Sequence, residues 1–183
     1  AMGPFATREL VTINPADVIP WSPNGWINDG GTETIGNNVS AHTDLTDDNI
    51  ADSPRPNGGA ARVFDFPLDT AVDPTLNNEA AVTQMFYFCN RYHDRLMALG
   101  FDEAAGNFQQ INFTAQGVGG DRVQADVLDS AANTPTSLNR NNANFSTSGA
   151  DGSTGRVQMY LFTGPTPDRD GTLDGDIVYH ELT

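Results

Sequence analysis

The chain has 183 residues and a mass of 19.6 kDa, which is enough for one domain with a buried core. Its 24 acidic residues outnumber 9 basic residues, all arginine, and the net charge of −15 would repel phosphate backbones and anionic membrane surfaces. We therefore expect no nucleic-acid partner and no membrane partner, and no stretch approaches the ~18 apolar residues of a membrane-spanning helix.

The first third of the chain predicts little regular structure. Residues 1–7, which begin Ala-Met-Gly, have the character of a vector-derived remnant and a short tail. Residues 8–59 alternate short apolar pieces with Asn, Asp, Gly and Pro, so we expect an irregular, turn-rich segment. This segment contains four closely spaced aspartates, for which a solvated acidic loop is favoured over a calcium site: Asp44, Asp47, Asp48 and Asp52.

One segment is clearly helical, residues 78–99. Apolar residues recur three and four positions apart along it, a spacing that places them on one helix face. They are Val82, Met85, Cys89, Tyr92, Leu96 and Leu99. Asn78 can cap the start and Gly100 can end the helix in a left-handed conformation. Within it we expect Cys89 to be a buried structural thiol and His93 to be a hydrogen-bonded structural residue.

Short strands are predicted around this helix. Residues 61–69 alternate polar residues with Val and Phe, and residues 107–113 and 121–127 show the same alternation. Residues 139–162 contain two further strands separated by a turn rich in Gly, Ser and Asp. The expected fold is therefore α+β, with one dominant helix, several irregular strands and a second helix beginning near the end of the sequence.

The sequence ends in His180-Glu181-Leu182-Thr183, the first four positions of the zinc-peptidase motif H-E-x-x-H. Two histidines four residues apart share a helix face and can both coordinate one zinc ion. The glutamate after the first histidine can take a proton from a water that the zinc has made more acidic. His180 would be the first ligand and Glu181 the general base. The same four residues are also common at the start of an ordinary helix. The choice between these two interpretations therefore depends on the rest of the sequence.

Longer motifs supply that context. Residues 77–113 read NNEAAVTQMFYFCNRYHDRLMALGFDEAAGNFQQINF, preceded by SPNGWINDG and GNNVSAH. NNANF, VQMYLF and RDGTLDGDIVYHE follow in order. From about Ser22 to Thr183 the sequence resembles the fungalysin family (M36) of secreted zinc metallopeptidases, whose fold is thermolysin-like. The resemblance implies an irregular, β-rich N-terminal lobe, here residues 8–183, which forms one wall of a cleft against a helical C-terminal lobe that is absent from this sequence.

The resemblance also implies roles for individual residues. His180 would bind zinc and Glu181 would be the general base, while Asn142 and Ala143 match an edge-strand element that hydrogen-bonds the substrate backbone. An Asn-rich loop near a turn is the alternative for that last pair. The family implies protein or peptide substrates, an extracellular location, and an inhibitory propeptide that is not recognisable in this sequence.

A second acidic cluster precedes the final helix and is a candidate calcium site. Alternating carboxylates and glycines are typical of calcium loops, although the glutamate that closes an EF-hand is absent. The cluster consists of Asp168, Asp170, Asp174 and Asp176. The alternative is that these aspartates cap turns and favour the positive end of the helix that follows.

The 183 residues by themselves are predicted to be catalytically inert, because one histidine with an adjacent glutamate does not make a tetrahedral zinc site. The parent protein is expected to be a zinc endopeptidase. The competing interpretation is a non-catalytic, acidic and calcium-stabilised binding module that descends from a peptidase and has lost its chemistry; it predicts a residue other than histidine at position 184.

Overall fold

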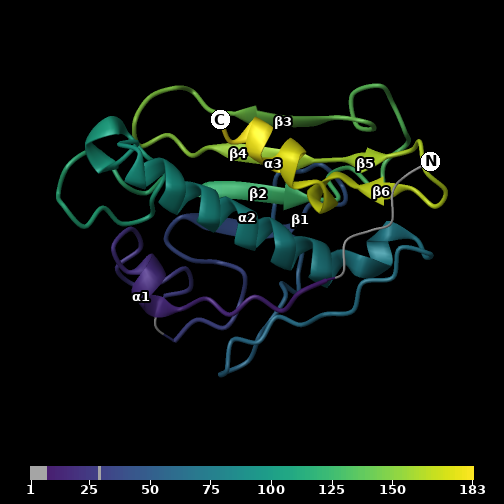
Figure 1. Cartoon of the computed structure of the whole chain (residues 1–183). Helices are drawn as coiled ribbons and strands as arrows, with labels where there is room; N and C mark the ends of the chain where they lie inside the picture. The colour runs from purple at the N-terminus through teal and green to yellow at the C-terminus, as the bar shows by residue number, and fades with distance from the viewer. Residues whose placement is uncertain (1–7, 29) are drawn as a thin grey trace.

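The longest helix crosses one face of a four-stranded sheet in the computed structural model (Figure 1). The structure describes residues 8–28 and 30–183, so the remnant and tail predicted at residues 1–7 lie outside the described residues. The α-helices are α1 (Pro15–Val18), α2 (Asn78–Ala98) and α3 (Gly175–Glu181), and the 3-10 helices are η1 (Pro74–Asn77), η2 (Glu103–Ala105) and η3 (Gly171–Leu173). The strands are β1 (Val39–Thr43), β2 (Val123–Val127), β3 (Ala143–Ser146), β4 (Arg156–Met159), β5 (Leu161–Phe162) and β6 (Arg169–Asp170).

The sheet is mixed, with the strand order β1-β2-β4-β3. The pairs β1–β2 and β2–β4 are parallel, while β3 runs antiparallel to β4 at the edge. Strands β5 and β6 form a separate antiparallel pair. One long helix packed on a mixed sheet confirms the predicted α+β class.

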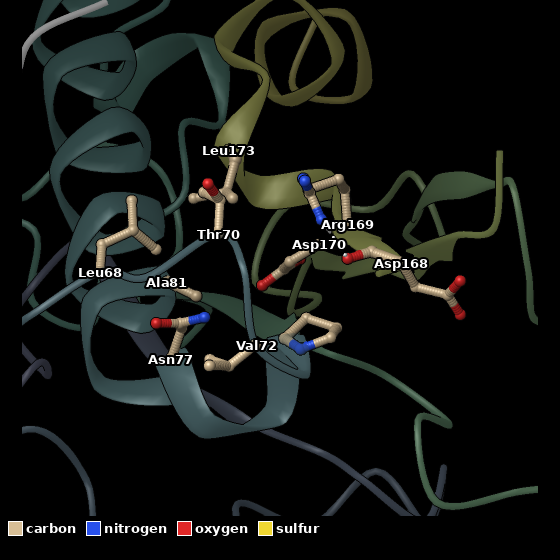
Figure 2. Close-up of a pocket in the computed structure, with 10 residues that line it drawn as sticks. Leu68, Thr70, Val72, Asn77, Ala81, Asp168, Arg169, Asp170 and Leu173 are labelled. Carbon is tan, nitrogen blue, oxygen red and sulfur yellow. Dashed lines mark hydrogen bonds between the residues drawn. The ribbon is translucent and has the colours of Figure 1, made fainter. Parts of the chain in front are cut away.

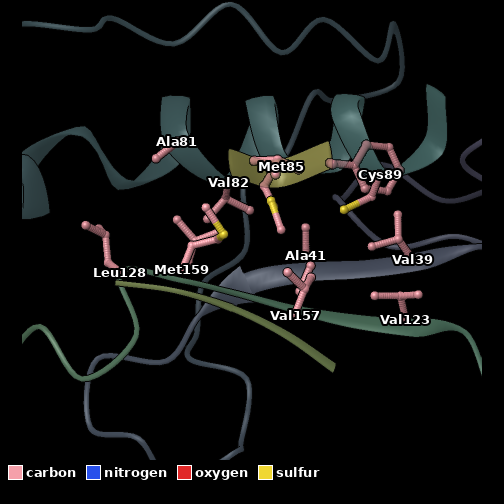
Figure 3. Packing of buried hydrophobic residues seen from close by; sticks show 14 of the residues in the cluster. Val39, Ala41, Ala81, Val82, Met85, Cys89, Val123, Leu128, Val157 and Met159 are labelled. Carbon is pink, nitrogen blue, oxygen red and sulfur yellow. The ribbon is translucent and has the colours of Figure 1, made fainter. Parts of the chain in front are cut away.

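The core lies between α2 and the sheet (Figure 3). Val82, Met85 and Cys89 of α2 face the sheet, where the buried apolar residues come from β1, β2 and β4. These include Val39, Ala41, Val123, Ala125, Val127, Val157 and Met159. Since strand side chains alternate between the two faces, the residues between them lie on the face opposite α2.

The predicted helix is confirmed, with corrections at both ends. Asn78 is the first residue of α2 rather than its cap, because η1 runs directly into the helix at Asn77. Gly100 adopts φ +103°, as the helix-end prediction required. The apolar stripe does not stay buried, since Leu99 is 66% exposed. Cys89 is buried, and burial raises the pKa of its thiol to about 12, which confirms the structural role.

Three of the expected strands are present: β2 lies within residues 121–127, and β3 and β4 lie within residues 139–162. The strands predicted at residues 61–69 and 107–113 are wrong. At the start of the first segment, residues 58–63 form a tight turn. The backbone amide of Arg62 donates to Gly59 O, and that of Val63 donates to Gly58 O.

In the second segment, residues 107–113, three backbone amides bond to side chains instead of a neighbouring strand. Gln109 N donates to Asp121 Oδ1, and Ile111 N donates to Asn37 Oδ1. Phe113 N donates to Glu103 Oε1. Fixed side-chain acceptors therefore hold an irregular segment that has strand-like alternation. Among the described residues, no helix is long and apolar enough to cross a lipid bilayer.

Candidate active site

The helix that carries His180 and Glu181 is short, and it is held in place by an N-terminal cap and by one buried side chain. Asp174 caps it, its side chain accepting a hydrogen bond from Asp176 N at 3.0 Å. Val178 is completely buried and anchors the helix on the core. A helix repeat of 3.6 residues then places Asp176, Ile177, His180 and Glu181 on a shared face.

The residues predicted to bind a substrate backbone lie at the start of an edge strand. Ala143 is the first residue of β3, and β3 pairs with β4 alone in the described part of the chain. The opposite edge of β3 therefore presents unpaired backbone groups, which can accept an extended peptide as an additional strand. Asn142 lies immediately before the strand and donates from Nδ2 to Leu138 O at 3.2 Å.

Helix α3 lies beside β3 near the end of the chain (Figure 1). Between them is an open groove of about 380 Å³. Its lining contains all four residues predicted for the active site: His180, Glu181, Asn142 and Ala143. His180 is exposed and Glu181 is half-buried, so an imidazole and a carboxylate are both accessible to a molecule in the groove.

The groove has four further lining residues: Asn141, Phe162, Asp176 and Ile177. Phe162 and Ile177 add apolar surface, which suits the side chain of a bound peptide better than a small polar molecule. Asn141 fixes the position of β5, which carries Phe162. Its backbone amide donates to Leu161 O at 2.8 Å, and its side-chain Oδ1 accepts from Thr163 N at 2.8 Å. Asn141 and Phe162 belong to the motifs NNANF and VQMYLF, but neither was predicted to line the groove, because tertiary folding brings β5 to it.

The imidazole of His180 and the carboxylate of Glu181 are donor types that zinc binds in proteins. The groove thus offers one imidazole and one carboxylate, the two groups that the first half of H-E-x-x-H contains. His93, in contrast, is a hydrogen-bonded residue of α2: its Nδ1 lies 3.0 Å from Asp94 Oδ1 and Asn107 Nδ2 lies 3.4 Å from its Nε2.

The four aspartates of the second acidic cluster have separate surroundings, and the last of them, Asp176, lies inside α3. Asp174 caps α3 and Asp170 caps η3, accepting from Thr172 N at 3.0 Å. Asp176 lines the groove, and Figure 2 shows the carboxylates of Asp168 and Asp170 pointing in different directions. In the described part of the chain these aspartates do not form a group of three close carboxylates. The capping alternative thus has direct support for two of the four, and calcium binding by the cluster stays a prediction.

Asp170 lies at a small cavity of about 10 Å³ between η1, α2 and β6, large enough for about one water molecule (Figure 2). Burial raises the pKa of Asp170 to about 6, although hydrogen bonds from Thr172 act in the opposite direction. Its Oδ2 is buried and accepts no hydrogen bond from residues 8–28 or 30–183. This site is internal and too small for a substrate.

The acidic loop of the first third is only partly solvated. Asp47 and Asp48 are exposed, as predicted, and Asp52 is half-buried with its Oδ2 accepting from Leu45 N at 2.9 Å. The prediction is wrong for Asp44, which is completely buried. Asp44 comes directly after β1, a strand that the composition of this segment did not reveal.

The sequence is similar to those of known metallopeptidases. The sequence model of the fungalysin metallopeptidases (M36) matches residues 4–183. An extracellular metalloproteinase MEP of Fusarium vanettenii is 41% identical over 90% of the chain, and one of Pyricularia oryzae is 38% identical over 98%. Extracellular metalloproteinase 3 of Trichophyton soudanense is 39% identical over 93% of the chain.

These relatives are longer: the chain spans 26%, 29% and 44% of their respective lengths. The match nevertheless extends through nearly all of the 183 residues and includes the groove between α3 and β3. The chain therefore belongs to the fungalysin metallopeptidase family (M36).

Proposed function

We propose that residues 8–183 are the N-terminal part of the catalytic unit of a secreted zinc endopeptidase. The observation that carries the proposal is the convergence of His180, Glu181, Asn142 and Ala143 on one groove. They come from two elements more than thirty residues apart in the sequence, and sequence motifs alone selected them. The names of the relatives, extracellular metalloproteinases, support the metallopeptidase activity and the extracellular location.

In this proposal the imidazole of His180 holds the zinc ion together with ligands outside the 183 residues. When bound there, zinc would supply Lewis acidity, which polarises a peptide carbonyl and makes water a stronger acid. Glu181 accepts the proton from the attacking water and passes it to the leaving amine. The backbone at Asn142 and Ala143 holds the substrate in an extended conformation along the open edge of β3, while Phe162 and Ile177 contact a substrate side chain.

The remaining lobe of the parent protein would complete the cleft. The open form of the groove and the small share of the relatives' lengths that the chain spans both support this arrangement. A propeptide that covers the groove until secretion is proposed on the family resemblance. The 183 residues alone are proposed to be inert, since they provide a single histidine to the metal.

The test compares casein hydrolysis by the complete parent protein and by the 183-residue chain. We expect the complete protein to cleave casein, to lose the activity with a chelator, and to regain it with zinc, while the shorter chain cleaves nothing. Chelator-sensitive cleavage by the shorter chain would contradict the proposed inertness. A complete protein without activity, and with a residue other than histidine at position 184, would instead support the non-catalytic binding module.

A further inference from the structure

A second group of chemistry-bearing residues lies on the face of the sheet opposite α2. His42 of β1 is in register with Asp126 of β2, which is in register with Gln158 of β4. Asp44 follows the last residue of β1, and Asp129 lies two residues beyond the end of β2. Because β1 and β2 are parallel and pair as far as Thr43 and Val127, both aspartates emerge at the same edge of the sheet.

The three aspartates form a close and completely enclosed group. Asp44, Asp126 and Asp129 each have 0% exposed surface. One carboxylate oxygen from each lies within 4.8 Å of the corresponding oxygens of the other two. Oxygens bound to one calcium ion at 2.3–2.6 Å can be at most about 5 Å apart, so the spacing suits a shared cation.

Protein donors leave part of this group unsatisfied. Asp44 accepts hydrogen bonds from the amides of Asp48 and Asn49 at 3.1 and 2.8 Å. Asp129 Oδ2 accepts from Gln158 Nε2 at 2.5 Å, but Asp129 Oδ1 is buried and accepts from no donor in the described part of the chain. An unpaired oxygen on a fully buried carboxylate is costly, which itself indicates a missing partner.

Asp126 is better compensated, since a guanidinium and an imidazole both lie beside its carboxylate. Arg156 pairs with its Oδ2. His42 Nε2 lies 2.9 Å from its Oδ1, although the pair is not aligned as a hydrogen bond. Arg55 Nη1 lies 3.1 Å from His42 Nδ1. The same Nδ1 also lies 3.1 Å from the carbonyl oxygen of Ser40, so His42 is held between β1 and Arg55 on one side and Asp126 on the other.

The charges therefore do not cancel, since the three buried carboxylates face two guanidiniums, that of Arg156 beside Asp126 and that of Arg55 in contact with His42. The exposed Asp47 adds a further negative charge nearby. Burial, with the charges of Asp47, Asp126 and Asp44, raises the pKa of Asp129 to about 7 against the opposing hydrogen bond from Gln158. Burial also raises the pKa of Asp44. The excess of about two negative charges can be neutralised by one divalent cation or by protons.

We propose that Asp44, Asp126 and Asp129 bind one calcium ion at the carboxyl edge of the parallel strands β1 and β2. Carboxylate oxygens are the hard ligands that calcium prefers, and no sulfur atom is in the group. The ion would link the loop after β1 to the loop after β2. It would thereby stabilise the pairing of these two strands in the sheet that also contains β4 and β3. The site is separate from the groove that contains His180.

The test is calorimetric titration of the chelator-treated 183-residue chain with calcium chloride at neutral pH. Asp129→Asn is the test variant, because it keeps the shape of the side chain and an acceptor for Gln158. Asp48→Asn is the matched control: Asp48 belongs to the same acidic loop but is exposed, and its side chain caps the amide of Ile50. Circular dichroism checks that each variant is folded.

We expect the wild-type chain to bind calcium, Asp129→Asn to bind it at least tenfold more weakly, and Asp48→Asn to match the wild type. Calcium should raise the melting temperature of the wild type and of Asp48→Asn more than that of Asp129→Asn. Equal affinity in the wild type and Asp129→Asn would overturn the proposal. So would binding of magnesium without calcium. The absence of binding, with Asp129→Asn more stable than the wild type in chelator, would assign the neutralisation to protons.

Discussion

The ring of Tyr92 stacks on the ring of Tyr179, with centroids 5.0 Å apart and planes inclined by 28°. This contact joins the second half of α2 to the helix that carries His180 and Glu181. The hydroxyl of Thr183 donates to Tyr179 O at 2.6 Å, so the Tyr92 hydroxyl, 2.6 Å from Thr183 Oγ1, must be the donor in that second bond. One side chain of α2 thus contacts both the middle and the end of the segment that forms the proposed metal site.

Replacing Tyr92 should loosen the attachment of α3. Aromatic pairs contribute about 0.5–1.5 kcal/mol beyond their buried area, and a hydrogen bond about 0.5–1.5 kcal/mol. We expect Tyr92→Ala to lower the free energy of unfolding by about 1–3 kcal/mol and Tyr92→Phe by about 1 kcal/mol or less, both measured by urea denaturation. If Tyr92→Phe cost as much as Tyr92→Ala, the hydroxyl rather than the stacked ring would hold the helix.

The apolar stripe of α2 provides a matched pair of core variants. Met85 is completely buried between α2 and the sheet, whereas Leu99 is 66% exposed. Met85→Ala should cost about 2–5 kcal/mol of stability, because it removes buried surface and leaves a cavity. Leu99→Ala should change the stability by about 0.5 kcal/mol or less. Equal losses in thermal or urea unfolding would show that the end of α2 is buried in solution.

The contrast between α2 and β1 explains which elements the sequence predicts. The periodicity of α2 is a local signal that extends over twenty residues, and a glycine with positive φ follows its end. Strand β1 has five residues, all buried, and three of them are polar: Ser40, His42 and Thr43. Its partner β2 is eighty residues away, so the pairing that defines the strand leaves no local pattern.

In the candidate site, too, some residues are predicted from local sequence and others depend on contacts distant in the sequence. Ordered motifs along the chain point to His180, Glu181, Asn142 and Ala143, because these residues lie in recognisable local sequences. Phe162 ends the motif VQMYLF, but nothing local places it in the groove, since its position depends on the pairing of β5 with β6. Asp44 looked like part of a polar loop, and only the packing of β1 against β2 places it in a closed group with Asp126 and Asp129.

Gly36 is required by a close backbone approach. A Cβ atom at this position would lie 1.7 Å from the carbonyl oxygen of Trp26. Gly36→Ala should therefore force the segment before β1 away from Trp26 and lower stability by about 2 kcal/mol or more. Gly164 has no neighbour within 4 Å of the equivalent position. Gly164→Ala should leave the melting temperature nearly unchanged, and a similar drop for both variants would contradict this explanation.

The buried carboxyl of Asp170 predicts a definite pH dependence. Its pKa is raised from 3.8 to about 6, so between these values the folded chain holds a proton that the unfolded chain has lost. Stability should therefore fall as the pH rises from about 4 to 6, by up to about 3 kcal/mol from this group.

The variant Asp170→Asn isolates that contribution and keeps an acceptor for Thr172 N. In chelator it should lose less stability than the wild type over the same pH interval, as measured by thermal unfolding. The dependence of stability on pH should become weaker in the variant but should not disappear. The reason is that the pKa of Asp129 is also raised, to about 7, so its carboxyl also lowers stability as the pH rises. Parallel wild-type and variant curves would contradict the assignment.

The central claim is that His180 binds the metal and that Glu181 is the general base of a zinc endopeptidase. The most direct measurement is kcat for peptide hydrolysis by the Glu181→Gln variant of the complete parent protein, with bound zinc determined on the same sample. We predict zinc content equal to the wild type with kcat lowered about 10²–10⁴-fold, as expected for loss of a general base, while the exposed control Glu79→Gln keeps full activity. A Glu181→Gln enzyme with wild-type kcat and full zinc content would contradict the account.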